Sequence, residues 1–234
     1  NRLGFEPNAV KQITDITNAT NVIKITYIFS HLAASEDLNE QEFTHQQINL
    51  FKTIKTEFEA LSNDNPFAHL TNTSGILNYP EAHFDMVRTG IGLYGFGNSE
   101  IHSKNLKPIA VLKSIISQIH TIQKGESLGY NRGYIASETT KTATIPIGHA
   151  DGISRQYGNG KGYVFINNQK APIIGNVCMD MIMVDVTTIK CNETDEVIIY
   201  DGSHTASSLA QSINTISYEI ITATSRRIKR VIQR

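Results

Sequence analysis

MVRTGIGLYG, residues 86–95, is the stretch around which the rest of the chain is organised. A strand-like segment, 84–87, leads into Arg88, and Gly90 and Gly92 follow where the backbone can approach a ligand closely. Successive N–H groups in such a turn form a concave anion site that suits a phosphate. The arginine adds a fixed cation and hydrogen-bond donor beside it. The same pattern also occurs in common turns, so its meaning depends on the surrounding sequence.

Upstream of this stretch, the hydrophobic pattern predicts alternating helices and strands. Apolar residues repeat every three positions behind Pro7, as in a helix. A capping-box-like pair, Asn39 and Glu42, starts a longer apolar stripe at helical spacing. The nearly continuous apolar and β-branched run 22–29 predicts a strand covered on both faces. Together these elements predict an α/β unit with a parallel sheet, with a long helix over 40–61 and strands over 22–29, 67–71 and 84–87.

The pattern changes after Phe96, because no long helical stripe follows it. Segments rich in β-branched residues predict strands instead, and Asn167–Asn168 predicts a tight hairpin turn between two of them. We place a domain boundary in the connector, which gives an α/β domain at 1–104 and a mostly β domain at 105–234. The expected strands cover 110–122, 142–147, 162–166, 170–174, 182–186, 196–200 and 228–232, with one short helix over 207–213.

The composition is that of an ordinary soluble globular protein, with 40% hydrophobic and 18% charged residues among 234 and a net charge of −1. This balance gives no reason to expect nucleic acid or an anionic membrane as a partner. No uncharged apolar run is long enough for a membrane span, so we expect a cytoplasmic protein. Cys178 and Cys191 lack metal-type spacing, so we expect free thiols and no metal site. The chain begins at Asn1 rather than methionine, which we interpret as the middle of a longer protein.

Residues 86–95 resemble the arginine–glycine segment of bacterial alanine racemases, which bind pyridoxal phosphate. The resemblance implies the last strands of a TIM (β/α)8 barrel followed by a mostly β C-terminal domain. Three barrel strands cannot close a barrel, so upstream sequence is needed. In this family the lysine that binds the cofactor also lies upstream, so this chain is expected to be inactive alone. Further segments match in the family's order and spacing, namely SHLA at 30–33, TNT at 71–73, SLGYNRGY at 127–134, IGHADG at 147–152 and CMD at 178–180.

The resemblance assigns the chemistry to three side chains. Tyr134 matches the family's tyrosine base, which moves the α-proton on one face of the substrate. A free phenol has a pKa of about 10, so it acts as a base at neutral pH only when nearby positive charge favours the phenolate. His31 and Arg88 match the residues that supply this charge, and Arg88 also donates to the pyridine nitrogen. An arginine keeps that nitrogen unprotonated, which favours simple proton return over transamination.

The cofactor contacts follow from the same resemblance. The phosphate is expected at Thr73 and at the backbone of Gly90 and Ile91. His31 is expected to stack on the cofactor ring. Arg226 aligns with a tyrosine that the family commonly has in its phosphate site, and an arginine can also bind phosphate.

The substrate contacts and the entrance are assigned in the same way. Arg2 and the backbone N–H of Met179 are expected to hold the substrate carboxylate, since a guanidinium and an oriented amide form a suitable anion site. Glu36 and Arg155 match an acidic–basic pair of the family's access corridor. His149 stands in this corridor where a tyrosine is more usual.

The implied function is interconversion of L-alanine and D-alanine through a pyridoxal phosphate aldimine by a two-base mechanism, which supplies D-alanine for peptidoglycan. In this family the lysine and tyrosine bases come from different subunits, so a homodimer with shared active sites is expected. Three alternatives stay open: a racemase of broader substrate range, a barrel-type decarboxylase with a catalytic cysteine, and a non-catalytic module for cofactor binding or dimerisation. Cys178 precedes Met179 and Asp180 in the racemase-like manner, which ranks the decarboxylase lower.

Overall fold

In the computed structural model, which describes residues 2–20, 22–97 and 100–233, the chain divides into two compact units. The first is Asn1–Lys107 and the second is Pro108–Arg234. Within the described ranges, no helix is both long enough and apolar enough to cross a membrane.

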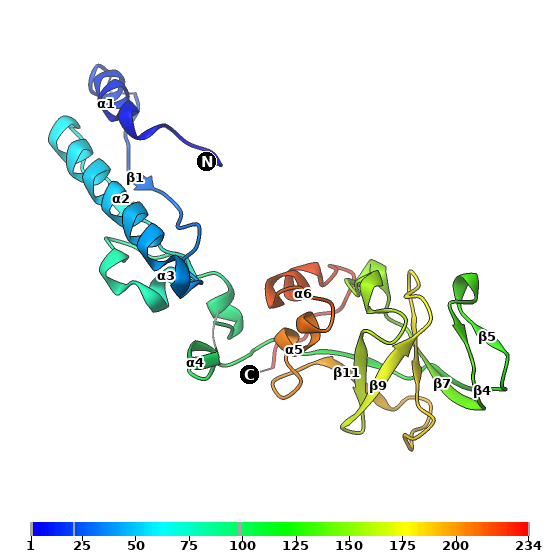
Figure 1. The fold of residues 1–234 in the computed structure, drawn as a ribbon. Coiled ribbons are helices and arrows are strands. Elements are labelled where there is room, and N and C mark those ends of the chain that lie inside the picture. The colour runs from blue at the N-terminus through cyan, green and yellow to red at the C-terminus, as the bar shows by residue number, and fades with distance from the viewer. Residues whose placement is uncertain (1, 21, 98–99, 234) are drawn as a thin grey trace. The chain divides into compact units, whose positions relative to one another are not determined.

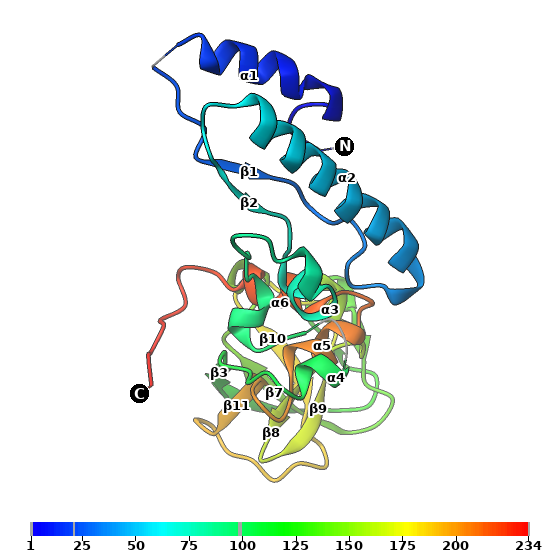
Figure 2. The ribbon, with the colours of Figure 1, turned by 90° about the vertical axis from the view of Figure 1, so that its left-hand side faces the viewer.

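The first unit is built on a parallel pair of strands that a long helix covers. Strand β1 (Tyr27–Phe29) pairs in parallel with β2 (Phe67–His69), which confirms the predicted parallel pairing. Helix α2 (Gln41–Leu61) carries Ile48 and Phe51 into a buried core on this pair. The end of α1 (Val10–Asn18) lies against the end of α2, where the Asn18 side chain donates to the carbonyl oxygen of Leu61 at 2.7 Å (Figures 1 and 2). The other elements are η1 (Pro7–Ala9), η2 (Leu38–Glu40), α3 (Thr73–Asn78), η3 (Pro80–Ala82), η4 (Ile91–Tyr94) and α4 (Glu100–Ser103).

All three strands predicted in this unit differ in extent from the observed ones, and the one predicted over 67–71 ends at His69. The run 22–29 forms a strand only at Tyr27–Phe29, and both end residues of that strand are exposed rather than covered. The segment 84–87 forms no named strand, and only Met86 makes a bridge, to His69. A strand exists only where a neighbouring strand supplies hydrogen-bond partners, and an apolar run alone does not provide them.

The predicted capping box is also wrong. The side chain of Asp37, not Asn39, accepts a hydrogen bond, from the N–H of Asn39 at 2.9 Å. This caps the 3-10 turn η2, which precedes the helix, and the helix itself begins at Gln41 without a side-chain cap. The predicted long helix is confirmed over nearly its full length.

The second unit is mostly β, as predicted. Two short helices lie together at one end of its large sheet (Figure 1). Short 3-10 turns occupy the loops. The strands are β3 (Leu112–Ile115), β4 (Gln118–Ile122), β5 (Ser127–Leu128), β6 (Tyr134–Ile135), β7 (Thr140–Ile145), β8 (Tyr163–Ile166), β9 (Gln169–Ile174), β10 (Ile182–Asp185) and β11 (Glu196–Tyr200), and the helices are η5 (Tyr130–Arg132), η6 (His149–Asp151), η7 (Arg155–Tyr157), α5 (Ala206–Gln211) and α6 (Ser217–Ala223).

The sheet curls back on itself. Among the described residues it has seven antiparallel strands in the order β3-β11-β8-β9-β10-β7-β4, and β5 and β6 form a separate hairpin. Its two edge strands, β3 and β4, are separated only by Ile116 and Ser117. The carbonyl oxygen of Ile116 accepts from Thr194 at 2.8 Å, while the N–H of Ser117 donates to Thr144 at 2.9 Å. Because one short segment joins both edges, the sheet is curled like part of a barrel around a buried interior.

The predicted hairpin turn in this unit is confirmed, whereas two of the predicted strands differ from the observed ones. Asn167 and Asn168 form the predicted hairpin turn between β8 and β9, with left-handed φ of 49° and 60°. The predicted strand 110–122 is two strands, because the chain crosses from one sheet edge to the other at Ile116. Residues 228–232 form no strand, and α6 was not predicted. The residues that fill the interior are Ala143, Ile145, Val164, Ile166, Ala171, Ile173, Ile182, Val184 and Val197.

Candidate active site

Arg88 lies across the ends of both strands of the first unit. Its own N–H donates to the carbonyl oxygen of Thr71 at 3.1 Å, which fixes the backbone that carries it. Its guanidinium donates to the carbonyl oxygens of Ser30 (2.8 Å), Leu70 (3.1 Å) and His69 (3.3 Å), and also to Nδ1 of His69. These bonds use the two terminal nitrogens. The Nε–H has no acceptor among the described residues, so one donor of a firmly held guanidinium is left for a ligand.

His69 was not predicted as a site residue. It ends β2, and its ring stacks on that of Phe29, with centroids 5.0 Å apart and planes 6° from parallel. Because a guanidinium has no acceptor atom, His69 Nδ1 must accept from Arg88, which places the imidazole proton on Nε2. Burial and the positive charge of Arg88 lower the pKa of His69, so the neutral ring is favoured. No clear sequence signal marks it, because the predicted strand extends over 67–71 and places His69 in its middle, whereas the observed strand ends at His69.

His31 follows β1 and lies in the electrostatic field of several predicted site residues. Burial, Arg2 and Arg88 lower the pKa of its imidazole, and Glu36 acts in the opposite direction. The neutral form of His31 is therefore favoured at neutral pH. The structure thus brings His31, Arg88, Arg2 and Glu36 within interaction range at the strand ends of the first unit.

Thr73 holds the glycine loop closed. Its Oγ1 accepts hydrogen bonds from the N–H groups of Gly90 (3.0 Å) and Gly92 (3.2 Å), and the residue is almost fully buried at the start of α3. A Cβ added at Gly92 would lie 3.0 Å from Thr73 Cγ2 and 3.3 Å from Thr89 Cγ2, so a larger residue there would push the Thr73 side chain aside. Within the described ranges, neither the Thr73 O–H nor the Ile91 N–H has an acceptor. The Gly90 N–H is engaged by Thr73, so the hydroxyl and the Ile91 amide are the available donors.

Tyr134 lies in the second unit, in the small hairpin formed by β5 and β6. It pairs with Leu128, and its hydroxyl lies 3.4 Å from Oγ1 of Thr140. The turn that leads into it contains Asn131 (φ 56°) and Arg132 (φ 51°), two consecutive residues in the left-handed region. Such a turn is costly for residues other than glycine, so the surrounding structure must hold it in place.

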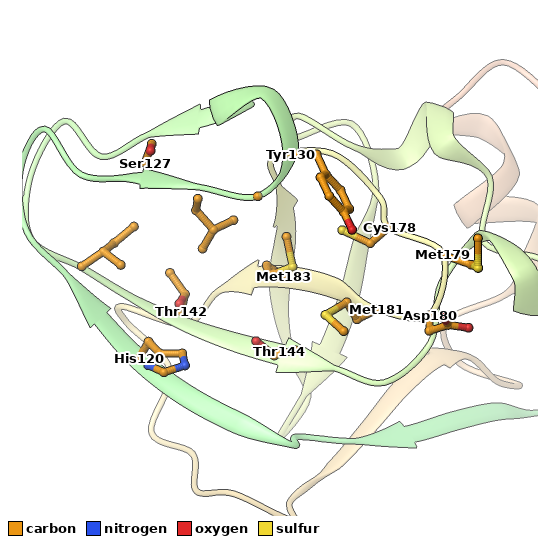
Figure 3. Close-up of a pocket in the computed structure, with 13 residues that line it drawn as sticks. His120, Ser127, Tyr130, Thr142, Thr144, Cys178, Met179, Asp180, Met181 and Met183 are labelled. Atoms are coloured by element: carbon orange, nitrogen blue, oxygen red, sulfur yellow. The ribbon is translucent and has the colours of Figure 1, made fainter.

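A cavity of about 520 Å³ lies between this hairpin and the sheet (Figure 3). Figure 3 shows Tyr130 pointing toward Cys178, with Met179 and Asp180 at the same end of the cavity. The Met179 side chain is 59% exposed, and its N–H has no acceptor in the part of the chain that the structure describes. Tyr134 itself is outside the lining. The cavity therefore lies beside the loop that carries Met179.

The remaining predicted site residues also belong to the second unit. His149 begins η6 and Arg155 begins η7. Arg226 is exposed near the C-terminal end. Neighbouring Arg227, which the sequence did not single out, forms ion pairs with Asp151 and Asp180.

Domain comparisons assign both units to one family. The alanine racemase N-terminal domain matches residues 1–97, and the alanine racemase C-terminal domain matches residues 109–232. Alanine racemase 1 of Clostridium acetobutylicum is 37% identical, with 98% of this chain and 61% of that protein covered. The alanine racemase of Cutibacterium acnes is 36% identical, with 98% and 62% covered. This chain therefore spans about three fifths of the length of the relatives it matches.

Solved structures give the same result. The alanine racemase from Bartonella henselae with covalently bound pyridoxal phosphate matches with a TM-score of 0.86 at 30% identity, covering 99% of this chain and 63% of that one. The Clostridium difficile 630 alanine racemase in complex with cycloserine matches with a TM-score of 0.85 at 32% identity, covering 97% and 61%. Two consecutive domain matches and these relatives cover nearly all of the sequence, so the chain belongs to the alanine racemase family.

Proposed function

We propose that the complete protein is a pyridoxal phosphate-dependent alanine racemase, to which this chain contributes most of the active site. The relatives carry that name, and one solved neighbour holds covalently bound pyridoxal phosphate. The proposal rests chiefly on Arg88. Its guanidinium is fixed at the strand ends by hydrogen bonds, and its Nε–H has no acceptor among the described residues. We also propose that residues 1–104 belong to the barrel domain of this enzyme and residues 105–234 to its β domain.

The donor set of the first unit fits this cofactor. A phosphate needs hydrogen-bond donors, and the Thr73 O–H and Ile91 N–H are both without an acceptor among the described residues. The pyridine nitrogen needs one donor, which the Arg88 Nε–H supplies. His31 would stack on the ring, the Gly90 backbone would line the phosphate loop, and Arg226 would add a further phosphate contact.

When bound, the cofactor withdraws electrons from Cα of a bound amino acid and weakens its Cα–H bond. Arg88 would donate to the ring nitrogen without giving up a proton, because a guanidinium stays protonated at any working pH. His69 cannot protonate that nitrogen through Arg88, since its Nδ1 accepts. Arg88 would therefore leave the ring nitrogen unprotonated, which would favour return of the proton to Cα.

Tyr134 would remove the α-proton from one face of the substrate in one direction of the reaction, and return it to that face in the other, at its hydroxyl oxygen. It needs nearby positive charge or hydrogen-bond donors to act as a base, and we propose that Arg88 of the other subunit supplies the charge and that His31, whose neutral form is favoured, supplies a donor. The opposite face would be served by a lysine in the part of the protein outside this chain. Racemisation thus requires a homodimer, and this chain alone should not racemise alanine.

The substrate and product would use the remaining residues. Arg2 and the N–H of Met179 would hold the carboxylate of alanine. Glu36, His149 and Arg155 would line the route by which alanine enters. The product D-alanine would serve peptidoglycan synthesis, and the protein would work in the cytoplasm.

A subunit-mixing experiment on the complete protein tests both the chemistry and the shared site. Tyr134→Phe and Arg88→Gln should each lower the racemisation rate of L-alanine by about 10²–10⁴-fold. A mixed dimer that contains one subunit of each kind has one site with both residues intact and one site with neither. Random pairing makes about half of the dimers mixed, so the mixture should recover about a quarter of wild-type activity.

The outcomes are distinct. If each site used Arg88 and Tyr134 of a single subunit, every site in the mixture would carry a defect and no activity would return. Retention of full activity by Tyr134→Phe would exclude Tyr134 as the base. A wild-type dimer without racemase activity would overturn the proposed function.

A further inference from the structure

We propose that Arg227 is a positioning residue for the substrate carboxylate, acting through the loop that presents the Met179 N–H; this rests on the proposed function above. Arg227 itself would not touch the substrate. It would fix the direction of a neighbouring amide by joining two carboxylates from different loops.

Arg227 joins two loops that are far apart in the sequence. Its Nε donates to Asp151 Oδ1 at 2.6 Å and its Nη2 to Asp151 Oδ2 at 2.9 Å, a two-pronged pairing with a buried carboxylate. The same Nη2 donates to Asp180 Oδ1 at 2.6 Å. A planar guanidinium is the side chain suited to this geometry. Asp180 directly follows Met179, so the clamp ends one residue from the proposed substrate contact.

The two loops are also joined through their backbones. The N–H of His149 donates to the carbonyl oxygen of Cys178 at 2.9 Å, and that of Ala150 donates to Met179 at 3.0 Å. A Cβ added at Gly148 would lie only 2.4 Å from the Met179 carbonyl oxygen, so the loops pack without space between them. Asp151 takes part in both the side-chain and the backbone connections, because its carboxylate also accepts a hydrogen bond from the Gly148 N–H at 2.9 Å.

These bonds determine where the Met179 N–H points. In a trans peptide the carbonyl and the following N–H point in opposite directions. The carbonyl of Cys178 points at His149, so the N–H of Met179 points away from the η6 loop. Consecutive peptides are thus held by hydrogen bonds, and the next side chain, Asp180, is held by Arg227. Figure 3 shows Met179 and Asp180 at the end of the cavity, and Met179 is among the residues that line it.

Charge balance supports a positioning role over direct substrate binding. Arg227 already faces two carboxylates, which offset its charge, so it is poorly suited to hold a third. The hydrogen bond from Arg227 is the main reason why the pKa of Asp151 is lowered, which keeps this carboxylate ionised and the clamp closed near neutral pH. Loss of the clamp should therefore release the loop rather than remove a substrate contact.

The test uses the complete protein with bound pyridoxal phosphate and two probes that each carry half of the substrate. Propionate has the carboxylate without the amine, and ethylamine has the amine without the carboxylate. Asp180→Asn removes the negative charge from one arm of the clamp and leaves the Asp151 pair intact, while Arg227→Met removes both arms. We expect the dissociation constant of propionate, measured by calorimetry, to rise about tenfold in each variant, with that of ethylamine unchanged. Glu196→Gln, which breaks the exposed ion pair with Lys113 in the same unit, is the matched control and should change neither.

Each alternative result has a definite meaning. Equal weakening of both probes in Asp180→Asn would indicate a purely structural role and overturn the inference. Unchanged propionate binding in both variants would overturn it as well, while leaving the proposed function standing if the wild type racemises alanine. A wild type that neither binds propionate nor racemises alanine would overturn the proposed function, and the inference with it.

Discussion

Substitution of Gly92 by alanine should selectively weaken binding of the cofactor phosphate. The added Cβ would meet Thr73 Cγ2 at 3.0 Å, Thr89 Cγ2 at 3.3 Å and Thr73 Oγ1 at 3.4 Å. Attractive carbon–carbon contacts begin at about 3.5–4.0 Å, so the Thr73 side chain must move by several tenths of an ångström. That side chain holds the N–H groups of Gly90 and Gly92. The loop and the hydroxyl would therefore shift together.

The size of the effect follows from the bond that is disturbed. A hydrogen bond to a charged partner is worth about 1.5–3 kcal/mol, and about 1.4 kcal/mol is a tenfold change in affinity. We therefore expect about a 10- to 100-fold rise in the dissociation constant for pyridoxal phosphate. Overpacking of the loop should in addition lower the free energy of unfolding by about 1–3 kcal/mol.

The assay is a titration of the complete protein, stripped of cofactor, with pyridoxal phosphate and with pyridoxal, followed by absorbance. Pyridoxal lacks the phosphate, so its affinity should be unchanged in Gly92→Ala. Gly202→Ala is the control, because a Cβ added there meets nothing within 4 Å. Wild-type affinity for pyridoxal phosphate in Gly92→Ala, or an equal loss for both ligands, would refute a phosphate role for this loop.

Three further substitutions test the folded state. Asp151→Asn removes a carboxylate whose pKa is lowered chiefly by Arg227. This ionised carboxylate stabilises the folded state fully above its ordinary pKa of about 3.9. The stabilisation disappears as the pH falls through the lower pKa that Asp151 has in the folded protein. Melting temperatures of wild type and Asp151→Asn should differ at neutral pH and converge in strong acid; a constant difference would contradict this. Asn168→Val places a β-branched residue at φ 60° and should cost about 1–2 kcal/mol in urea unfolding, whereas Asn168→Gly should be almost neutral. Phe51→Ala empties a core site packed against Phe84 and should cost about 3–5 kcal/mol by the same measurement, and a loss below 1 kcal/mol would mean that the core collapses around it.

The long helix, the parallel strand pair and the β-rich second unit were predictable because each leaves a local pattern in the sequence. The errors concern pairing between distant segments. Residues 228–232 include three β-branched residues, which favours a strand, yet Arg230 donates to nearby carbonyl oxygens, including that of Thr224 at 3.0 Å, and no strand pairs with the segment. Helix α6 left no signal because its β-branched residues favour strands, and burial of Ile220 and Ile221 holds it instead.

Residues of the candidate site could be predicted where they lie in a recognisable motif. They could not be predicted where their role depends on contacts with residues far away in the sequence. Arg88 and Thr73 lie in short matched segments. His69 and Arg227 act through partners 19 and 47 to 76 positions away, and a single sequence gives no measure of such contacts. From the sequence alone, nothing distinguishes His69 and Arg227 as site residues from their neighbours Leu70 and Arg226. The fold is what selects between them.

The partners of Arg88 bear on the alternatives left open by the sequence. A decarboxylase-like use of Cys178 would need a reactive thiolate, but burial raises the pKa of this thiol and so disfavours it. Arg88, by contrast, has acceptors for both terminal nitrogens, and none of these partners is a carboxylate that would neutralise its charge. The guanidinium therefore keeps its positive charge. Under the proposed function it would oppose protonation of the pyridine nitrogen and stabilise a nearby phenolate. Both effects would favour reversible proton transfer at Cα, whereas a carboxylate at this position would oppose both.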